Sequence, residues 1–128
     1  MDNKSAVPAK RVLIVDDNRD AADTLAALLQ GEGYEVRACY DGREALEQAS
    51  AFQPHAVILD IRMPRLTGYE VARDFKRESR GTAPALIALT GATGESAELR
   101  ARMAGFDHYV AKPADAATLL ELLSRLPA

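Results

Sequence analysis

The stretch Val57-Ile58-Leu59-Asp60-Ile61-Arg62-Met63-Pro64 places one aspartate directly behind a short apolar run. That run predicts a buried strand over Ala56–Leu59, followed by a loop that Pro64 and Gly68 bracket. A carboxylate is seldom buried without a partner, because removing its charge from water is costly. Other parts of the chain must therefore compensate the charge of Asp60.

The composition predicts one cytoplasmic domain. The chain has 128 residues, 48% of them hydrophobic, and a net charge of -3. A sequence pI of about 5.4 argues against direct nucleic-acid binding, and no apolar run is long enough for membrane insertion. We expect a flexible leader over residues 1–10 and the domain over residues 11–126. Cys39 is the only cysteine, which excludes a disulfide within the chain and fits a reducing cytoplasm. We expect Cys39 to be buried.

Strand and helix patterns alternate along the whole domain. The predicted strands are Val12–Val15, Tyr34–Cys39, Ala56–Leu59, Ala85–Leu89 and Asp107–Ala111. The first predicted helix begins after a cap at Asn18 or Asp20, has apolar positions that include Ala21, Leu25, Leu28 and Leu29, and ends at Gly31 and Gly33. The other predicted helices cover Arg43–Ala51, Tyr69–Ser79 and Glu95–Ala104, and a last helix, which Asp115 can cap, runs to about Leu126. Such alternation is typical of the α/β class, with a doubly wound, five-stranded parallel sheet and helices on both faces.

Polar side chains stand at the ends of four of these strands. They are Asp16 and Asp17, Asp60, Thr90, and Lys112. The second strand instead runs into Tyr40-Asp41-Gly42, which we interpret as a turn. Ligands of open parallel sheets bind beyond the carboxyl ends of strands, where the strand order reverses. The simplest arrangement that gathers these residues therefore places the site between the first and third strands, with the second strand outside.

Three neighbouring aspartates and a lysine suit phosphoryl chemistry. Carboxylates held close together raise one another's pKa, and a divalent cation removes that conflict. All-oxygen ligands favour Mg²⁺, with Mn²⁺ as a substitute. A carboxylate can act as the nucleophile that forms an aspartyl phosphate, while Lys112 and the Thr90 hydroxyl bind phosphoryl oxygens.

These residues, taken in order, resemble those of a known family. The acidic pair Asp16-Asp17, Asp60 within Leu59-Asp60-Ile61-Arg62-Met63-Pro64, Gly68, Thr90, Tyr109 and Lys112-Pro113 carry the resemblance. Over about residues 11–126 the chain resembles the receiver domains of response regulators in two-component signalling. The resemblance implies a flavodoxin-like sheet with the strand order 2-1-3-4-5.

The resemblance also implies a role for each site residue. Asp60 would accept a phosphoryl group from the phosphohistidine of a histidine kinase or a histidine phosphotransfer protein. Asp17, Asp60 and the backbone carbonyl of Arg62 would bind Mg²⁺, and Asp16 would hold a metal-bound water. Thr90 and Lys112 would contact the phosphoryl oxygens.

Two further features belong to the same resemblance. Tyr109 would turn inward as Thr90 moves toward the phosphoryl group, although plain packing is the alternative for this tyrosine. The peptide bond between Lys112 and Pro113 would be cis. The Arg62 side chain, in contrast, departs from the family pattern. It stands at the mouth of the site, where our hypothesis is that it modulates the lifetime of the phosphoryl group; the alternative is a solvated cation.

The implied function is signalling without a diffusible product, limited to self-catalysed phosphotransfer and slow autodephosphorylation. A downstream protein would bind the face formed by the fourth helix, fifth strand and fifth helix, which Glu98, Arg100 and Arg102 would decorate. Ala21 and Ala22 would form a docking patch for a phosphohistidine helix, or else be ordinary helix residues.

Several alternatives remain open at the level of the sequence. The chain could be a Mg²⁺-dependent phosphohydrolase, or a degenerate receiver that only docks partners. It could be a stand-alone regulator or a receiver cut from a hybrid kinase, which some of its passages resemble. Asp16 and Asp17 could simply cap the first helix. We expect His55 and His108 to be surface or strand-end residues.

Overall fold

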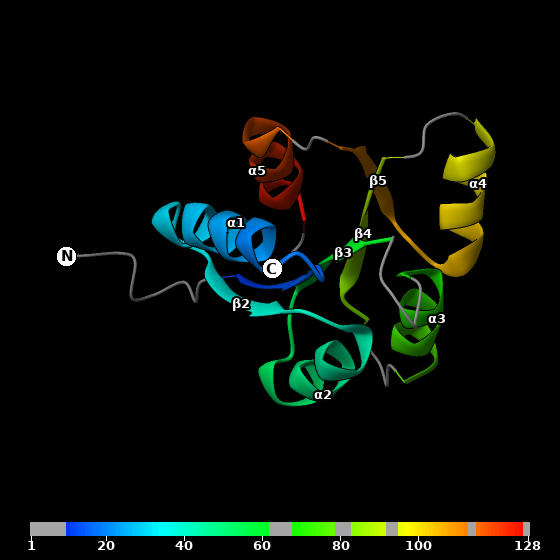
Figure 1. Cartoon of the computed structure of the whole chain (residues 1–128), viewed down its shortest axis with the longest axis horizontal. Helices are drawn as coiled ribbons and strands as arrows, with labels where there is room; N and C mark the ends of the chain where they lie inside the picture. The colour runs from blue at the N-terminus through cyan, green and yellow to red at the C-terminus, as the bar shows by residue number, and fades with distance from the viewer. Residues whose placement is uncertain (1–9, 62–67, 79–82, 92–94, 113–114, 127–128) are drawn as a thin grey trace.

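Five strands and five helices alternate through the residues that the computed structural model describes, which are 10–61, 68–78, 83–91, 95–112 and 115–126. In chain order they are β1 (Arg11–Val15), α1 (Arg19–Gly31), β2 (Glu35–Cys39), α2 (Gly42–Phe52), β3 (Ala56–Asp60), α3 (Gly68–Glu78), β4 (Ala85–Thr90), α4 (Glu95–Ala104), β5 (His108–Ala111) and α5 (Ala116–Ser124). The predicted α/β class is confirmed (Figure 1). The leader expected over residues 1–10 lies, apart from Lys10, outside the described residues.

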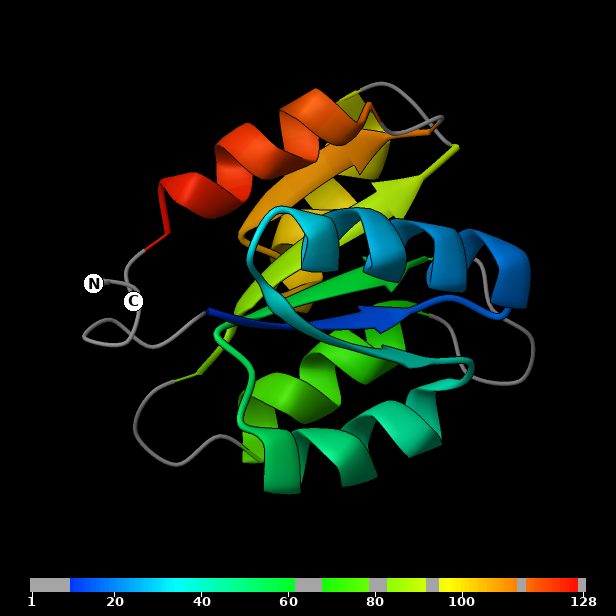
Figure 2. The same ribbon diagram turned by 90° about the vertical axis from the view of Figure 1, so that its left-hand side faces the viewer.

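The sheet has the strand order β2-β1-β3-β4-β5, and every pairing is parallel. The predicted order 2-1-3-4-5 is therefore confirmed. The register pairs Val15 with Leu59, Asp60 with Leu89, and Thr90 with Ala111. The carboxyl ends of the four strands β1, β3, β4 and β5 consequently lie level with one another, along one edge of the sheet that we call the carboxyl edge (Figure 2).

Helices cover both faces of the sheet, as predicted. Figure 2 shows α1 and α5 on one side, with α2 and α3 on the other. Successive strand residues point to opposite faces. Leu13 and Leu59 accordingly join the core beneath α2, α3 and α4, whereas Ile14 and Ile58 join the core beneath α1 and α5. The strands are apolar throughout because both of their faces are buried.

Helix α1 buries a different stripe from the one that its sequence suggested. Asn18 is its N-cap and accepts a hydrogen bond from the backbone N–H of Ala21. The buried residues are Ala22, Ala26 and Leu29, spaced at i, i+4 and i+7. The expected positions Ala21 and Leu28 are exposed, while Leu25 is half-buried. The helix is apolar on more than one side, so packing against the sheet selects the buried stripe.

Other boundaries moved by a residue or two. Asp60 and Thr90 are the last residues of their strands instead of the first residues after them. The chain bends at Tyr40 and Asp41, where a turn was predicted, and Asp41 also caps α2, since its side chain accepts from the N–H of Glu44. Cys39 is buried, as expected, and burial raises the pKa of its thiol to about 12. Among the described residues, none of the helices combines the length and the apolar composition that crossing a membrane requires.

Candidate functional site at the carboxyl edge

Three carboxylates meet at the carboxyl edge. Oxygens of Asp16, Asp17 and Asp60 all lie within 4.8 Å of one another. Asp16 and Asp17 follow β1 directly, Asp60 ends the neighbouring strand β3, and parallel pairing brings these ends side by side. Asp16 and Asp60 are only 5% and 4% exposed, whereas Asp17 is open to solvent. The edge thus holds two buried acids behind one exposed acid.

Lys112 compensates the charge of these acids. Its ammonium nitrogen Nζ lies 3.0 Å from Asp60 Oδ2 and 3.9 Å from Asp16 Oδ2. The backbone N–H of Lys112 donates to the carbonyl of Thr90 over 2.8 Å, which fixes the end of β5 beside the end of β4. Among the described residues, Lys112 is the cation that pairs with acids of this cluster, so this part of the site carries an excess of negative charge.

The charged form of Asp16 is destabilised by this arrangement. Burial raises the pKa of the Asp16 carboxyl, and the negative charge of Asp60 raises it further. The backbone N–H of Asn18, which donates to Asp16 Oδ1 over 2.9 Å, and the charge of Lys112 act in the opposite direction. A group that stabilises carboxylates is therefore favoured here.

The donor set fits a divalent cation. Three carboxylates supply only oxygen ligands, and such ligands suit Mg²⁺, which binds through one or two carboxylates and keeps several of its waters. The exposed carboxylate of Asp17 leaves the cluster reachable from solvent. The cluster could therefore hold a metal ion that is reachable from solvent.

Gly68 packs directly against the backbone of Asp60. Its N–H donates to the carbonyl of Ile61 over 3.0 Å. A Cβ added to Gly68 would lie 2.6 Å from Ile61 Cα and 2.9 Å from the carbonyl oxygen of Asp60. Real Cβ atoms do not approach backbone atoms so closely. Glycine at this position therefore lets the first residue of α3 contact the strand end that carries Asp60.

The remaining predicted residues divide into those that the structure places and those outside its described part. Thr90 is 2% exposed at the end of β4, and Tyr109 on β5 is half-buried against the core beneath α2, α3 and α4. Arg62, including its backbone carbonyl, and Pro113 lie outside the described residues. The docking patch predicted from Ala21 and Ala22 is wrong as stated, because Ala22 faces the core and is 1% exposed.

Some residues at this edge were not anticipated. Asn18 was expected to be a possible helix cap, but its backbone N–H also orients Asp16. The hydroxyl of Tyr40, beyond the end of β2, donates to Asp23 Oδ1 over 2.6 Å. The Arg19 guanidinium lies 4.1 Å from the centre of the Tyr40 ring. The sequence could have indicated Asn18, because it stands at a helix N-cap position. It could not have indicated the contacts of Tyr40, because these depend on how α1 packs beside β2.

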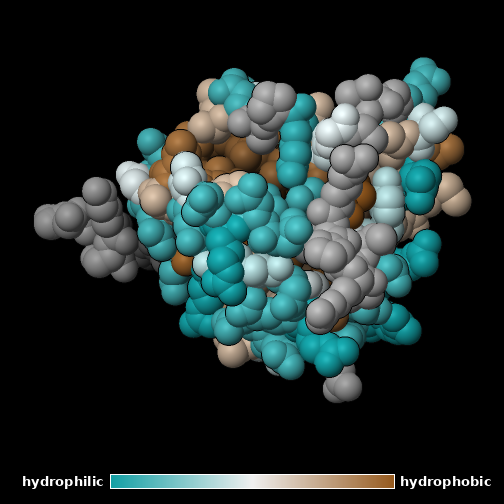
Figure 3. Space-filling view, viewed as in Figure 1, coloured by the Kyte–Doolittle hydropathy of each residue, from teal (hydrophilic) through white to brown (hydrophobic). Residues whose placement is uncertain are grey.

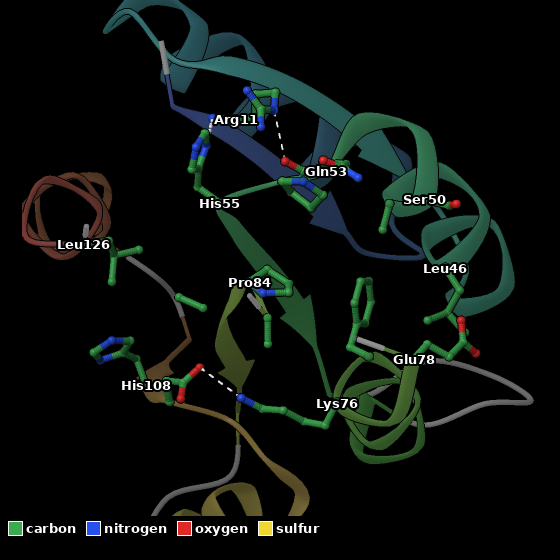
Figure 4. Close-up of a pocket in the computed structure, with 16 residues that line it drawn as sticks. Arg11, Leu46, Ser50, Gln53, His55, Lys76, Glu78, Pro84, His108 and Leu126 are labelled. Atoms are coloured by element: carbon green, nitrogen blue, oxygen red, sulfur yellow. Dashed lines mark hydrogen bonds and ion pairs between the residues drawn. The ribbon is translucent and has the colours of Figure 1, made fainter. Parts of the chain in front are cut away.

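A cavity of about 1020 Å³ lies at the opposite edge of the sheet, where the strands begin (Figure 4). Both histidines line it, which agrees with the expectation that they are strand-end residues. The backbone N–H of Arg11 donates to His55 Nδ1 over 2.9 Å, and Arg11 Nε donates to the carbonyls of Phe52 and Gln53. Asp107 accepts from the N–H of Leu86 and lies 3.7 Å from Lys76 Nζ. These polar groups are engaged in holding strand and helix ends together.

Comparisons with known proteins agree with the fold. A model of the response regulator receiver domain family matches residues 12–124. The response regulator MprA of Mycolicibacterium vanbaalenii is 40% identical over 118 residues, covering 92% of this chain and 49% of the relative. MprA of Mycobacterium tuberculosis is 39% identical over 120 residues, with the same coverage. This chain spans about half the length of the curated relatives it matches.

Solved structures extend the likeness to three dimensions. The chemotaxis protein CheY4 of Vibrio cholerae superposes with a TM-score of 0.87 at 31% identity, covering 94% of this chain and 100% of that chain. The receiver domain of Ssk1 from Saccharomyces cerevisiae, crystallised with the phosphotransfer protein Ypd1, has a TM-score of 0.83 at 22% identity and shares the fold, covering 91% of this chain and 88% of that chain. The chain therefore belongs to the response regulator receiver domain family of two-component signalling proteins.

Proposed function

We propose that this receiver domain is a phosphorylation-controlled switch whose phosphoacceptor is Asp60. The observation that carries the proposal is the cluster in which Asp16, Asp17 and Asp60 lie within 4.8 Å, with Lys112 Nζ 3.0 Å from Asp60 Oδ2. Asp60 stands centrally among these groups, at the end of the middle strand of the sheet. The donor is the phosphohistidine of a histidine kinase or of a histidine phosphotransfer protein.

The transfer exchanges one bond for another without any change of oxidation state. A carboxylate oxygen of Asp60 attacks phosphorus, the bond between phosphorus and the imidazole nitrogen breaks, and the bonding electron pair leaves with that nitrogen. The Asp60 carboxylate has to point toward the donor while its charge is held by Lys112. Phosphoryl transfer asks of the protein mainly positioning and charge stabilisation, which this geometry supplies.

The other side chains stabilise the phosphoryl oxygens and the acids. Thr90 and Lys112 contact phosphoryl oxygens, since Thr90 ends the neighbouring strand β4 and Lys112 Nζ lies 3.0 Å from Asp60 Oδ2. Asp16, Asp17 and Asp60, together with the backbone carbonyl of Arg62, hold Mg²⁺, and Mn²⁺ can replace it. The ion neutralises charge on the carboxylates and on the incoming phosphoryl group. Tyr109 follows the movement of Thr90 as the switch residue.

The phosphodonor docks across α1 and α5. Figure 3 shows apolar surface between these helices, whose partly buried leucines pack against one core cluster. Ala21 at the start of α1 is exposed and small, so a partner helix can approach the acidic cluster there. The co-crystal of the Ssk1 receiver with the phosphotransfer protein Ypd1 supports a partner of this class.

The output surface is the face of α4, β5 and α5. Leu99 and Met103 of α4 are 58% and 78% exposed, which is unusual for large apolar side chains. Arg102 pairs with Glu98 over 3.2 Å on one flank of the helix. Arg100, which was expected on the same face, instead lies with its guanidinium 4.8 Å from the ring centre of Tyr69, on the flank toward α3. The part of this surface that α4 contributes thus consists of Glu98, Leu99, Arg102 and Met103.

The activity is limited to self-catalysed phosphotransfer and slow autodephosphorylation, over a domain that we place at residues 11–126. A titration with beryllofluoride, a mimic of the phosphoryl group, and Mg²⁺ tests this proposal by two-dimensional amide NMR. We expect saturable shifts at the ends of β1, β3 and β4 that require Mg²⁺ and vanish in Asp60→Asn. Steady release of phosphate from acetyl phosphate at many turnovers per minute would point to a phosphohydrolase, and no response to either reagent would point to a docking module.

A further inference from the structure

The start of α3 is in direct contact with the phosphoacceptor strand. Gly68 lies so close to the Asp60 and Ile61 backbone that an added Cβ would approach Ile61 Cα to 2.6 Å. The hydrogen bond from Gly68 N–H to the Ile61 carbonyl, at 3.0 Å, fixes the contact further. The nearest atoms on the Asp60 side of this contact all belong to the backbone, which can absorb less displacement than a flexible side chain. A shift of the strand end must therefore move the first turn of α3.

Tyr69, the residue after Gly68, contacts α4. Tyr69 is half-buried, and its ring meets the Phe106 ring edge to face, at a centroid distance of 6.5 Å and an interplanar angle of 77°. The guanidinium carbon of Arg100 lies 4.8 Å from the Tyr69 ring centre, within the range of a cation–π interaction. Gly68 and Tyr69 are adjacent, so one dipeptide touches the Asp60 backbone, α4 and the residue that leads into β5.

Helix α4 is otherwise held by small side chains. Its fully buried residues are Ala101 and Ala104, whose methyl groups bury little area. Because an α-helix turns about 100° per residue, Arg100 lies on the opposite flank from Glu98 and Arg102. Figure 1 shows α3 and α4 as neighbours on the same side of the sheet, and the two helices are in contact. Arg100 therefore tethers the α3 flank of a loosely anchored helix.

We propose that Arg100 is a positioning residue that couples α4 to the backbone of Asp60 through Tyr69 and Gly68. This inference rests on the proposed function, because it assumes that Asp60 is the residue whose charge changes. A phosphoryl group on Asp60 shifts the strand end, Gly68 passes the shift to Tyr69, and Arg100 passes it to α4. The exposed pair Leu99 and Met103 then changes position with the state of the site.

Hydrogen exchange of the α4 amides, measured with and without beryllofluoride and Mg²⁺, tests the coupling. The variants are Arg100→Gln, which removes the cation, and Arg100→Lys, which keeps one. Arg102→Gln is the matched control, because it removes another exposed arginine of the same helix from the opposite flank. The Tyr69→Leu background gives the second half of a double-mutant cycle. Thermal unfolding of each variant verifies that it is folded.

In the parent we expect beryllofluoride to change exchange in both the β3 end and α4. In Arg100→Gln the change in α4 should shrink by about two- to fivefold, the size expected of one exposed cation–π contact. The change at β3 should persist in that variant. Arg100→Lys should recover part of the α4 response, Arg102→Gln should resemble the parent, and Arg100→Gln should add nothing in the Tyr69→Leu background.

Different results would overturn the coupling through Arg100 and the phosphoacceptor role of Asp60. An unchanged α4 response in Arg100→Gln, alongside a normal response at β3, would overturn the coupling and leave the phosphoacceptor intact. An equal loss in Arg102→Gln would overturn it as well, because the effect would then belong to helix charge in general. The absence of any response at β3 in the parent would overturn the proposed function, and with it the coupling.

Discussion

The two edges of the sheet use charged side chains in opposite ways. At the edge where strands begin, several charged side chains meet complementary partners: Arg11 donates to the carbonyls that end α2, and Asp107 accepts a backbone N–H and lies near Lys76. At the carboxyl edge, three carboxylates share the charge of Lys112, and burial raises the pKa of Asp16. Complementary pairing stabilises the fold, whereas gathered like charges create a demand for a ligand.

That difference is the reason for placing the candidate site at the carboxyl edge instead of in the cavity. The cavity of about 1020 Å³ is lined by both histidines, yet His55 Nδ1 is occupied by the N–H of Arg11. The carboxyl edge offers instead an excess of carboxylate oxygens around one partly exposed lysine. Charge imbalance is thus a better guide to function in this molecule than the volume of a hollow.

Adding Mg²⁺ should have the largest effect on stability. At a concentration about one hundred times its dissociation constant, the ion should stabilise the fold by about 2.7 kcal/mol, because it binds only the folded cluster.

Because the pKa of Asp16 is raised above its ordinary value of 3.8, ionised Asp16 costs stability at neutral pH. That cost is relieved as pH falls through the raised pKa, and the Mg²⁺ effect should fade over the same range.

Denaturant unfolding at several pH values, with and without Mg²⁺, measures this effect. Asp60→Asn is the control and should lose most of the stabilisation. Equal stabilisation of the parent and of Asp60→Asn would mean that the ion binds elsewhere.

Gly68→Ala should destabilise the fold by about 1–3 kcal/mol, because the new methyl group would overlap the backbone of Ile61 and Asp60. It should also weaken Mg²⁺ binding, since the strand end that carries Asp60 must move. Gly31→Ala is the matched control, because nothing lies within 4 Å of a Cβ there. Alanine at Gly31 should be neutral or stabilising by up to about 1 kcal/mol. Chemical denaturation of both variants decides the matter, and similar values would contradict the close contact.

His55→Phe should cost about 0.5–1.5 kcal/mol by removing the acceptor of the Arg11 N–H. Burial lowers the pKa of His55 below its ordinary value of 6.5, and the positive charges of Arg11 and Lys10 lower it further. The contribution of neutral His55 is therefore complete above pH 6.5 and is lost as pH falls through the lowered folded-state pKa.

The pH dependence of unfolding can be compared between the parent and His55→Asn, which keeps an acceptor but does not titrate. We expect the variant to lose the decline below pH 6.5 that His55 causes. His108→Asn, which removes the other imidazole of the cavity, should retain that decline. The reverse result would contradict the assignment of the decline to His55.

Lys10→Met should have the smallest effect, about 0.3–1 kcal/mol. Lys10 Nζ donates to the carbonyl of Leu123 over 3.0 Å and also to the carbonyl of Leu126, at the negative end of the α5 dipole. Lys10→Gln keeps a donor without the charge and should lie between the parent and Lys10→Met. Calorimetric melting in low and high salt distinguishes the charge from the hydrogen bonds; a loss equal in both variants and independent of salt would contradict the dipole contribution.

Much of the fold could be predicted because its signals are local. Apolar runs such as Val12–Val15 predict buried strands, and the polar residues behind them predict which edge carries chemistry. The stripe buried by α1 could not be predicted, because alanines and leucines occupy several sides of that helix and packing alone chooses among them. The strand order followed only from the family resemblance, since pairing between distant strands leaves no mark in one sequence.

Some features of the candidate site could also be predicted from the sequence, and others could not. Asp16, Asp17, Asp60 and Lys112 could be expected together because each stands at a strand end. The separation of Lys112 from Asp60, and the raised pKa of Asp16, depend on the register between strands and on burial. The contact of Gly68 with the Asp60 backbone, and that of Arg100 with Tyr69, join segments whose spacing in the chain gives no hint of them.

Direct location of the phosphoryl group tests the central claim that the carboxyl edge is a phosphoacceptor site. The protein is incubated with acetyl phosphate and Mg²⁺, the acyl phosphate is reduced with borohydride, and peptides are sequenced by mass spectrometry. We predict modification at Asp60 alone, dependent on Mg²⁺ and absent from Asp60→Asn. Modification of Asp16 or Asp17 in place of Asp60, or of no aspartate at saturating Mg²⁺, would contradict the claim.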